Sequence, residues 1–222
     1  MIPAIDLRVY AVLDPERCRG RAPAELAAAA AAGGATLVQL RDKRAPARLV
    51  AATAWQVQAA LAPFGLPLLI NDRVDVALAV GAAGVHLGQD DLAPADARRL
   101  LGSAAIIGAT VHHGPEADLL DAAAVDYAGI GPVFGTGSKA DAEAPIGPSG
   151  LAALIARTRR ERAGFPCCGI AGINHANAAS VIAAGADGVA VIADIFMADD
   201  VEAAARRLRG IVERALAGRS CP

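Results

Sequence analysis

The sequence has few aromatic residues and almost no net charge. Phe, Trp and Tyr together make up 3% of the 222 residues, and 21 Lys and Arg stand against 23 Asp and Glu, for a net charge of −2. A chain so close to neutrality has no bulk attraction for polyanions, so we expect neither a nucleic acid nor a membrane partner. Hydrophobic residues, by contrast, make up 55% of the chain, and about a quarter of all residues are alanine. The composition therefore favours a protein with a large buried core, in which any anion site is local.

The sequence also lacks an unbroken apolar run of membrane-spanning length. Its two longest uncharged stretches, residues 49–70 and 163–186, are each interrupted by Pro or Gly residues, which indicates helix and strand segments of a soluble core. The first ten residues, MIPAIDLRVY, show no cationic segment followed by an apolar one. We therefore expect no secretory signal and a cytoplasmic location.

Paired cysteine motifs are missing as well. Cys18, Cys167, Cys168 and Cys221 show neither the spacing of a zinc knuckle nor a Cys-x-x-Cys redox pair. Adjacent Cys167 and Cys168 would point to opposite faces of a strand. We expect all four thiols to be chemically inert.

One pattern recurs four times: an alanine-rich helical run, a turn of small residues, and a short β-branched segment. The copies begin at Ala27, Ala77, Leu119 and Val181. Their spacing of roughly fifty residues is that of a β-α-β-α unit, so four units give eight strands and eight helices. Expected strands are residues 8–13, 37–40, 68–70, 85–87, 106–109, 127–130, 167–170 and 189–192. Expected helices are residues 24–32, 47–61, 74–80, 94–101, 116–124, 149–161, 176–183 and 201–217.

The expected strands are short and apolar without polar alternation, as parallel strands covered on both faces are. Eight strand–helix alternations favour a closed (β/α)8 TIM barrel of the α/β class, and an open doubly wound sheet is the alternative. No linker divides the chain, so we predict a single domain over residues 1–222, with a core of about 8–217 and a C-terminal tail, 218–222.

In such a barrel the residues that follow the strands face one mouth. Gln39, Arg41 and Lys43 of the segment QLRDK alternate, so they would leave an extended strand on the same face. An amide and two cations suit an oxyanion such as phosphate, because a guanidinium binds two oxygens at once and an ammonium adds a point charge. A solvated run of charges is the alternative.

A second group of polar residues follows the next two strands. Asn71 and Asp72 end one strand, and the segment 88–91, which contains Asp91, follows the other. Two carboxylates beside amides fit Mg²⁺, which completes its octahedron with water and phosphate oxygens. Capping of the following helices by the two Asp residues is the alternative.

Two further groups complete the predicted mouth. The segment 131–148, GPVFGTGSKADAEAPIGP, carries Thr136, Ser138 and Lys139, which would equip a phosphate lid or, alternatively, lie in a disordered surface loop. Near the seventh and eighth strands, Gly172 and the segment 188–194 would bind a phosphate through backbone N–H groups, or simply form tight turns. Of the histidines, His86 and His112 are expected to be hydrogen-bonded wall residues rather than bases, and no nucleophile–base pair is evident.

Taken in order, these segments resemble the thiamine-phosphate synthase family. The resemblance is carried by QLRDK, LLINDRVDVALAVGAAGVHLGQDDL, GATVH, DYAGIGPVFGTGSK and GIAGI with GADGVAVIADI, and it spans residues 10–207. It implies a (β/α)8 barrel that joins 4-amino-5-hydroxymethyl-2-methylpyrimidine diphosphate to a thiazole phosphate and releases diphosphate, with these small molecules as its partners. The sequence does not decide between a monomer and a homo-oligomer.

The resemblance also implies roles for individual residues. The catalytic group would be Arg41, Lys43, Thr110 and Lys139, and Asp72 and Asp91 would hold Mg²⁺. The pyrimidine diphosphate would be bound by Gln39, Arg41, Lys43, Asn71, Thr110 and Lys139. The thiazole phosphate would be bound by Thr136, Gly137, Ser138, Gly172, Ile192 and Ala193.

Three positions depart from the family pattern. Thr110 stands where the family usually has serine, Ala171 precedes Gly172 where it has Gly-Gly, and Ala193 replaces a phosphate-binding serine. Two alternatives follow. One is the related thiazole tautomerase, which uses a histidine near the position of His112, and the other is a catalytically silent ligand-binding paralogue. The retained QLRDK segment and the Asp72/Asp91 pair favour the synthase.

Overall fold

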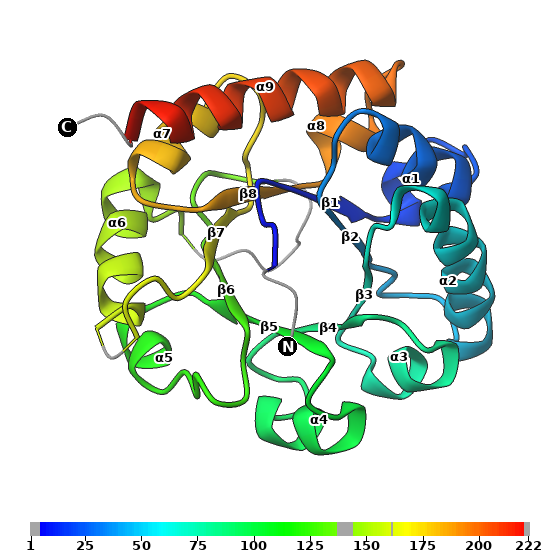
Figure 1. Ribbon diagram of the computed structural model, residues 1–222, viewed down its shortest axis with the longest axis horizontal. Coiled ribbons are helices and arrows are strands. Elements are labelled where there is room, and N and C mark those ends of the chain that lie inside the picture. The colour runs from blue at the N-terminus through cyan, green and yellow to red at the C-terminus, as the bar shows by residue number, and fades with distance from the viewer. Residues whose placement is uncertain (1–4, 137–143, 161, 220–222) are drawn as a thin grey trace.

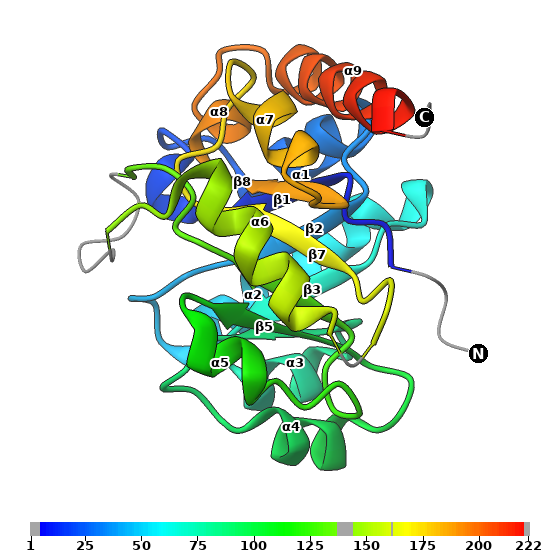
Figure 2. The same cartoon turned by 90° about the vertical axis from the view of Figure 1, so that its left-hand side faces the viewer.

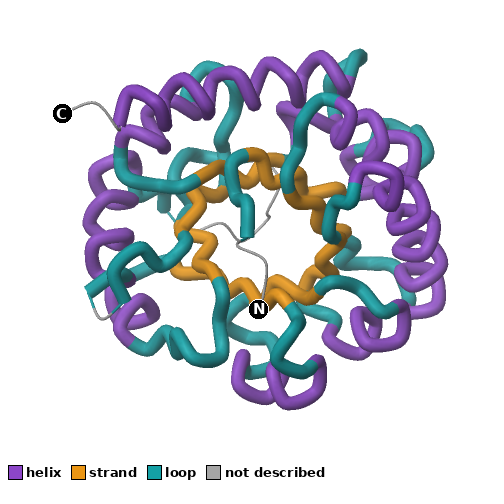
Figure 3. The backbone as a smooth tube through the Cα atoms, viewed as in Figure 1, coloured by secondary structure: helices purple, strands orange, loops and turns teal. Residues whose placement is uncertain are grey.

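Eight short strands pair side by side in chain order, and the eighth pairs with the first (Figures 1 and 3). The computed structural model describes residues 5–136, 144–160 and 162–219. All eight pairings are parallel. The helices form a layer outside this ring, as the two perpendicular views show (Figures 1 and 2). The closed (β/α)8 barrel expected from the four repeats is confirmed, and the open sheet is wrong.

The elements follow one another as strand and helix. The strands are β1 Val9–Leu13, β2 Leu37–Leu40, β3 Leu68–Asn71, β4 Gly84–Leu87, β5 Ile106–Val111, β6 Tyr127–Ile130, β7 Cys167–Ile170 and β8 Gly188–Val191. The helices are α1 Pro23–Ala32, α2 Ala47–Leu61, α3 Val74–Val80, α4 Pro94–Leu101, α5 Gly114–Asp118, α6 Gly147–Thr158, α7 Ala178–Ala183, α8 Ala193–Phe196 and α9 Val201–Arg219, with short 3-10 turns at Pro15–Arg17 and Ala62–Phe64.

Side chains alternate between two cores along each strand. In β1, Val9, Ala11 and Leu13 pack outward against the helices, whereas Tyr10 and Val12 point into the barrel. Both faces are therefore buried, which explains why the strands show no polar alternation in the sequence. Cys167 belongs to the outer core and Cys168 to the inner one, as expected for neighbours in a strand.

Two helices differ from the expectation. Helix α5 spans residues 114–118 and not 116–124, because Pro115 starts the helix at its first turn and the chain after Asp118 turns around Asp121. The alanine run 122–124 that suggested a helix lies in this turn. Helix α8 was not predicted at all, since its four residues are too short to show a helical period.

None of the helices in the part of the chain that the structure describes combines the length and apolar character needed to cross a lipid bilayer.

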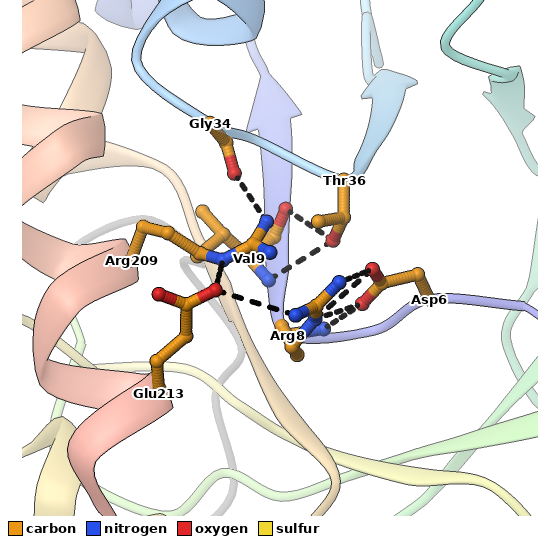
Figure 4. Close-up of polar contacts among 7 residues, drawn as sticks. All are labelled: Asp6, Arg8, Val9, Gly34, Thr36, Arg209 and Glu213. Atoms are coloured by element: carbon orange, nitrogen blue, oxygen red, sulfur yellow. Dashed lines mark hydrogen bonds and ion pairs between the residues drawn. The ribbon is translucent and has the colours of Figure 1, made fainter. Parts of the chain in front are cut away.

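Polar side chains fasten the amino ends of β1 and β2 to the last helix (Figure 4). Arg209 of α9 contacts Glu213 at 2.6 Å and donates to the Gly34 carbonyl at 3.0 Å. The Thr36 hydroxyl accepts from the Val9 amide at 3.1 Å. Arg8 reaches Glu213 at 3.3 Å and also pairs with Asp6. Together these contacts join the beginning of the chain to its last helix.

Two other strands have a similar polar contact at their amino ends. Asp126, just before β6, accepts from the Ile107 amide of β5 and pairs with Arg98 of α4, both at 2.7 Å. Asp187, just before β8, accepts from the Cys167 amide of β7 and pairs with Arg159, which directly follows α6. These positions and Thr36 correspond in three of the four copies of the sequence repeat, and the copy that begins at Ala77 has Ala83 there. These three copies therefore share a polar contact at the amino end of a strand.

Tight backbone spacing at Gly84 leads to a stability prediction. A Cβ at Gly84 would lie 1.8 Å from the carbonyl oxygen of Ile106 on the neighbouring strand, where only backbone movement could relieve the clash. We expect Gly84→Ala to lower the free energy of unfolding by about 3 kcal/mol, in the range for overpacking. Gly218→Ala, near the end of α9 with nothing within 4 Å, is the matched control and should not destabilise. Urea unfolding of both variants tests this, and equal stability of the two would contradict the close strand contact.

Candidate active site

A cavity of about 520 Å³ opens at the carboxyl ends of the strands. It brings together side chains that are far apart in the sequence, as the barrel topology predicts. The predicted site residues that line it are Gln39, Arg41, Lys43, Asn71, Asp72, Asp91, Thr110, Thr136, Gly172, Ile192 and Ala193. Gly137, Ser138 and Lys139 lie outside the described residues.

Arg41 is held at the mouth by a buried ion pair. Its Nη1 lies 2.6 Å from Oδ2 of Asp14, and the two side chains are 12% and 6% exposed. The Arg41 amide also donates to the Leu13 carbonyl at the end of β1. This burial rules out a solvated charge run as the environment of Arg41. Sequence reasoning missed Asp14, although its place directly after the first strand put it among the rim positions.

Two carboxylates and an ammonium lie together beside Arg41. Lys43 Nζ contacts Asp72 Oδ2 at 2.5 Å. Burial raises the pKa of the Asp72 carboxyl, the adjacent Asp91 raises it further, and Lys43 opposes both effects. Asp72 has a φ of 61°, a left-handed conformation that Asp tolerates better than most residues. The two carboxylates therefore form a site of concentrated negative charge that a cation would relieve.

The structure rules out helix capping by these two residues. The N-cap positions of α3 and α4 are Arg73 and Ala93, and neither helix has a side-chain cap. Asp91 instead accepts from the Gly88 amide at 2.7 Å within its own turn. In the described part of the chain, no three His, Cys, Asp or Glu residues group as a metal cluster. The pair thus suits a hard cation that takes two protein carboxylates and its other ligands from water or phosphate.

The floor of the cavity is a buried polar network inside the barrel. His86 contacts the Thr110 hydroxyl at 2.9 Å through Nε2 and the Tyr127 hydroxyl at 2.8 Å through Nδ1. The Tyr127 and Tyr10 hydroxyls are 2.8 Å apart, and Gln39 donates to Tyr10. His86 is therefore a hydrogen-bonded wall residue, as predicted. The two tyrosines were missed, because nothing in the apolar strands β1 and β6 shows that these side chains meet.

The segment after β6 packs against the turn after β7. The Phe134 amide donates to the Ala171 carbonyl at 3.2 Å, and a Cβ at Gly172 would lie 2.5 Å from the Gly135 carbonyl oxygen. Gly172 has a φ of 67° and Ala171 a φ of 68°. Only glycine fits position 172, whereas Ala171 adopts a left-handed backbone conformation that is unfavourable for a residue with a Cβ atom. This close approach places Thr136 at the cavity wall.

On the opposite side of that turn, α8 begins at the cavity. Ala193 and Asp194 both line it. The Asp194 carboxylate is held by His175, which contacts it through Nδ1 at 2.8 Å and through its backbone amide at 3.0 Å. His112 does not belong to the cavity lining within the described residues, and it contacts Glu116 at 3.2 Å. The mouth therefore has a charged side next to β2–β4 and a backbone-rich side next to β7 and β8.

Comparison with known proteins agrees with this arrangement. A family model described as thiamine monophosphate synthase matches residues 9–195. Thiamine-phosphate synthases of Xanthobacter autotrophicus and Chloroflexus aurantiacus are 50% and 47% identical over 93% and 94% of this chain, and 96% and 94% of theirs. The solved thiamine phosphate pyrophosphorylase from Pyrococcus furiosus is 35% identical with a TM-score of 0.82, over 96% of this chain and 98% of that one. The chain therefore belongs to the thiamine monophosphate synthase family and is a transferase of thiamine biosynthesis.

Proposed function

We propose that this protein condenses 4-amino-5-hydroxymethyl-2-methylpyrimidine diphosphate with a thiazole phosphate or carboxythiazole phosphate, depends on Mg²⁺, and releases diphosphate and thiamine monophosphate, together with CO₂ where the carboxythiazole is the substrate. The observation that carries the proposal is the meeting of Arg41 and Lys43 with Asp72 and Asp91 at one side of the cavity. Opposite charges in this arrangement suit a metal-bound polyphosphate. The backbone-rich side at β7 and β8 suits a second, smaller phosphate.

Asp72 and Asp91 are the residues that would hold Mg²⁺. Burial and the adjacent Asp91 both raise the pKa of Asp72, so the ionised pair is electrostatically unfavourable by itself and fits a divalent cation. When bound, Mg²⁺ supplies positive charge that neutralises the leaving diphosphate. Asn71, at the end of β3, adds an amide beside the carboxylates.

Arg41 and Lys43 would stabilise the negative charge that develops on diphosphate as the carbon–oxygen bond breaks. Asp14 fixes Arg41 through one terminal nitrogen, so the rest of the guanidinium can bind phosphate oxygens. Lys139, on the predicted lid, would add a further cation. The electron-rich aminopyrimidine supports the methylene cation, and the thiazole nitrogen captures it. This dissociative route needs positioning and electrostatics in place of a protein nucleophile.

The thiazole phosphate would lie against the second side of the cavity. Its predicted contacts are Thr136, Gly137, Ser138, Gly172, Ile192 and Ala193. Ala193 offers a backbone N–H but no hydroxyl, and the nearby Asp194 carboxylate carries charge of the same sign as a phosphate. The ring and the backbone amide of His175 contact this carboxylate. We therefore infer a thiazole-phosphate site that relies on backbone donors.

The activity itself is tested with purified protein, both substrates and MgCl₂. We expect diphosphate release that requires both substrates and stops when the metal is chelated. The measurement is diphosphate and thiamine monophosphate by chromatography. Isomerisation of the thiazole without metal and without diphosphate release would identify a tautomerase, which the position of His112 outside the cavity lining disfavours. Binding of both substrates with no turnover of either would identify a silent paralogue.

The metal site predicts a strong effect of Asp91→Asn. Removing one carboxylate of the pair weakens cation binding, so kcat/KM at limiting Mg²⁺ should fall about 100-fold, since metal stabilisation of a leaving group contributes several kcal/mol. Asp96→Asn makes the same charge change on α4, where Asp96 pairs with Arg99 away from the cavity, and should leave the rate unchanged. Mg²⁺ titrations of initial rates check both variants, and an unaltered Mg²⁺ dependence of Asp91→Asn would remove Asp91 from the site.

The ion pair behind Arg41 gives a second prediction. Asp14→Asn keeps the shape of the side chain but removes the charge that fixes the guanidinium, so kcat/KM for the pyrimidine diphosphate should fall about tenfold, the effect of one lost charged contact of about 1.4 kcal/mol. Asp6→Asn breaks a comparable pair with Arg8 at the other end of the barrel and is the control. Steady-state kinetics decide, and equal effects of the two substitutions would show that Asp14 contributes only to stability.

A further inference from the structure

A single file of hydrogen bonds crosses the interior of the barrel and reaches the cavity at both ends. It runs from Gln39 through Tyr10, Tyr127 and His86 to Thr110. Gln39 and Thr110 line the cavity, as do Tyr10 and His86, whereas Tyr127 does not. The file therefore connects two cavity-lining groups through a buried residue, Tyr127, that does not line the cavity.

Counting protons fixes the direction of every bond in this file. The Gln39 amide nitrogen donates to the Tyr10 hydroxyl and cannot accept. Tyr10 is buried, so leaving its own proton unpaired would be costly, and the neighbouring Tyr127 oxygen is in place to accept it. Tyr127 then donates to His86 Nδ1, because its oxygen already accepts from Tyr10. A histidine that accepts at Nδ1 carries its proton on Nε2, and this proton is donated to the Thr110 hydroxyl.

This direction determines what the two ends offer to a ligand. Thr110 accepts from His86, so its own proton is available as a donor at the cavity. Gln39 uses its amide nitrogen on Tyr10, so its carbonyl oxygen is available as an acceptor. One donor and one acceptor match a ring nitrogen next to an exocyclic amino group, which accepts and donates in turn. They do not match a ring N–H next to a carbonyl, in which both roles are reversed.

We propose that His86 is a positioning residue whose Nε2–H tautomer, set through Tyr127, makes the cavity select an amino-substituted nitrogen heterocycle over its oxo counterpart. The proposal rests on the proposed function, because it concerns the pyrimidine ring of that reaction. It adds a specificity determinant that acts through Thr110, one of the predicted substrate-binding residues. Rejection arises because the oxo ring would leave buried donors and acceptors unpaired.

The surrounding structure holds this file in place. A Cβ at Gly108 would lie 2.1 Å from Cζ of Tyr127, and one at Gly129 would lie 3.0 Å from Cε1 of His86, so glycines make room for both rings. The Tyr10 and Tyr127 rings meet edge to face, with centroids 5.8 Å apart. Burial raises the pKa of both phenols far above neutrality, so each keeps the proton that the file requires.

The tautomer can be observed directly. Protein labelled with ¹⁵N-histidine should show His86 with a protonated Nε2 and an unprotonated Nδ1, and comparison with the His86→Gln variant assigns its signals. A protonated Nδ1 would overturn the proposal, because His86 would then donate to Tyr127 and accept from Thr110.

Selectivity is tested with the aminopyrimidine diphosphate and its 4-oxo analogue as probes, by calorimetry in MgCl₂. The native protein should bind the amino form about 100-fold more tightly, because the oxo ring would lose its hydrogen bonds to both Thr110 and Gln39. Tyr127→Phe should reduce this ratio about tenfold, because His86 Nδ1 loses the Tyr127 hydroxyl that sets the tautomer in this proposal. His86→Gln, which can still accept and donate, should retain more of the ratio than His86→Leu.

Ile106→Val is the control for a purely structural effect. Ile106 packs in the same inner core but takes no part in the file, so its truncation should lower thermal stability without changing the binding ratio. An unchanged ratio in Tyr127→Phe, with stability lowered as in the control, would overturn the proposal. Both measurements need only binding. Absence of turnover with any pyrimidine and thiazole pair would therefore count against the proposed function and leave this proposal to be judged on its own results.

Discussion

Closure of the eight parallel strands into a ring is the constraint on which the rest of the structure depends. It turns every strand's carboxyl end toward one mouth, so Gln39 and Thr110, 71 positions apart in the sequence, line the same cavity. It also sends alternate side chains inward, where they have no access to bulk water except at that mouth. An inward polar side chain must then find a partner within the barrel, which is why Tyr10, Tyr127 and His86 bond to one another.

The sequence predicts the strands and most of the helices because the four repeats carry the period of the barrel. It predicts the charged side of the mouth for the same reason, since residues such as Asp72 and Asp91 follow strands directly. Contacts that depend on strand register, by contrast, could not be predicted from the sequence. Tyr10 is a single phenol in an apolar strand, and only the pairing of β1 with β2 shows that it lies beside Gln39. Helix α5 was misplaced because alanine content indicates helix, whereas Pro115 and Asp121 determine where the chain turns.

Neutrality of the whole chain conceals strong local charge, and the charges at the mouth are mutually compensated. Arg41 pairs with Asp14, and Lys43 pairs with Asp72. Because an unpaired charge in a partly buried site is costly, such pairs let the cavity hold cationic and anionic groups before any ligand enters. In the proposed reaction Asp72 and Asp91 would hold the cation, and the Lys43 ammonium would then be available to phosphate oxygens.

Contacts that stabilise the barrel lie at the amino ends of the strands, whereas the candidate active-site residues lie at their carboxyl ends. At the amino ends, Asp126 and Asp187 join neighbouring strands to helices, and Arg209 ties α9 to the turn before β2. At the mouth the backbone is strained instead: Asp72 and Ala171 both hold positive φ angles without being glycine. Such conformations cost free energy and persist only when the surrounding structure enforces them. The polar contacts at the amino ends and the two packed cores supply that enforcement, so the barrel can present a carboxylate and a tight turn in geometries that an isolated loop would not keep.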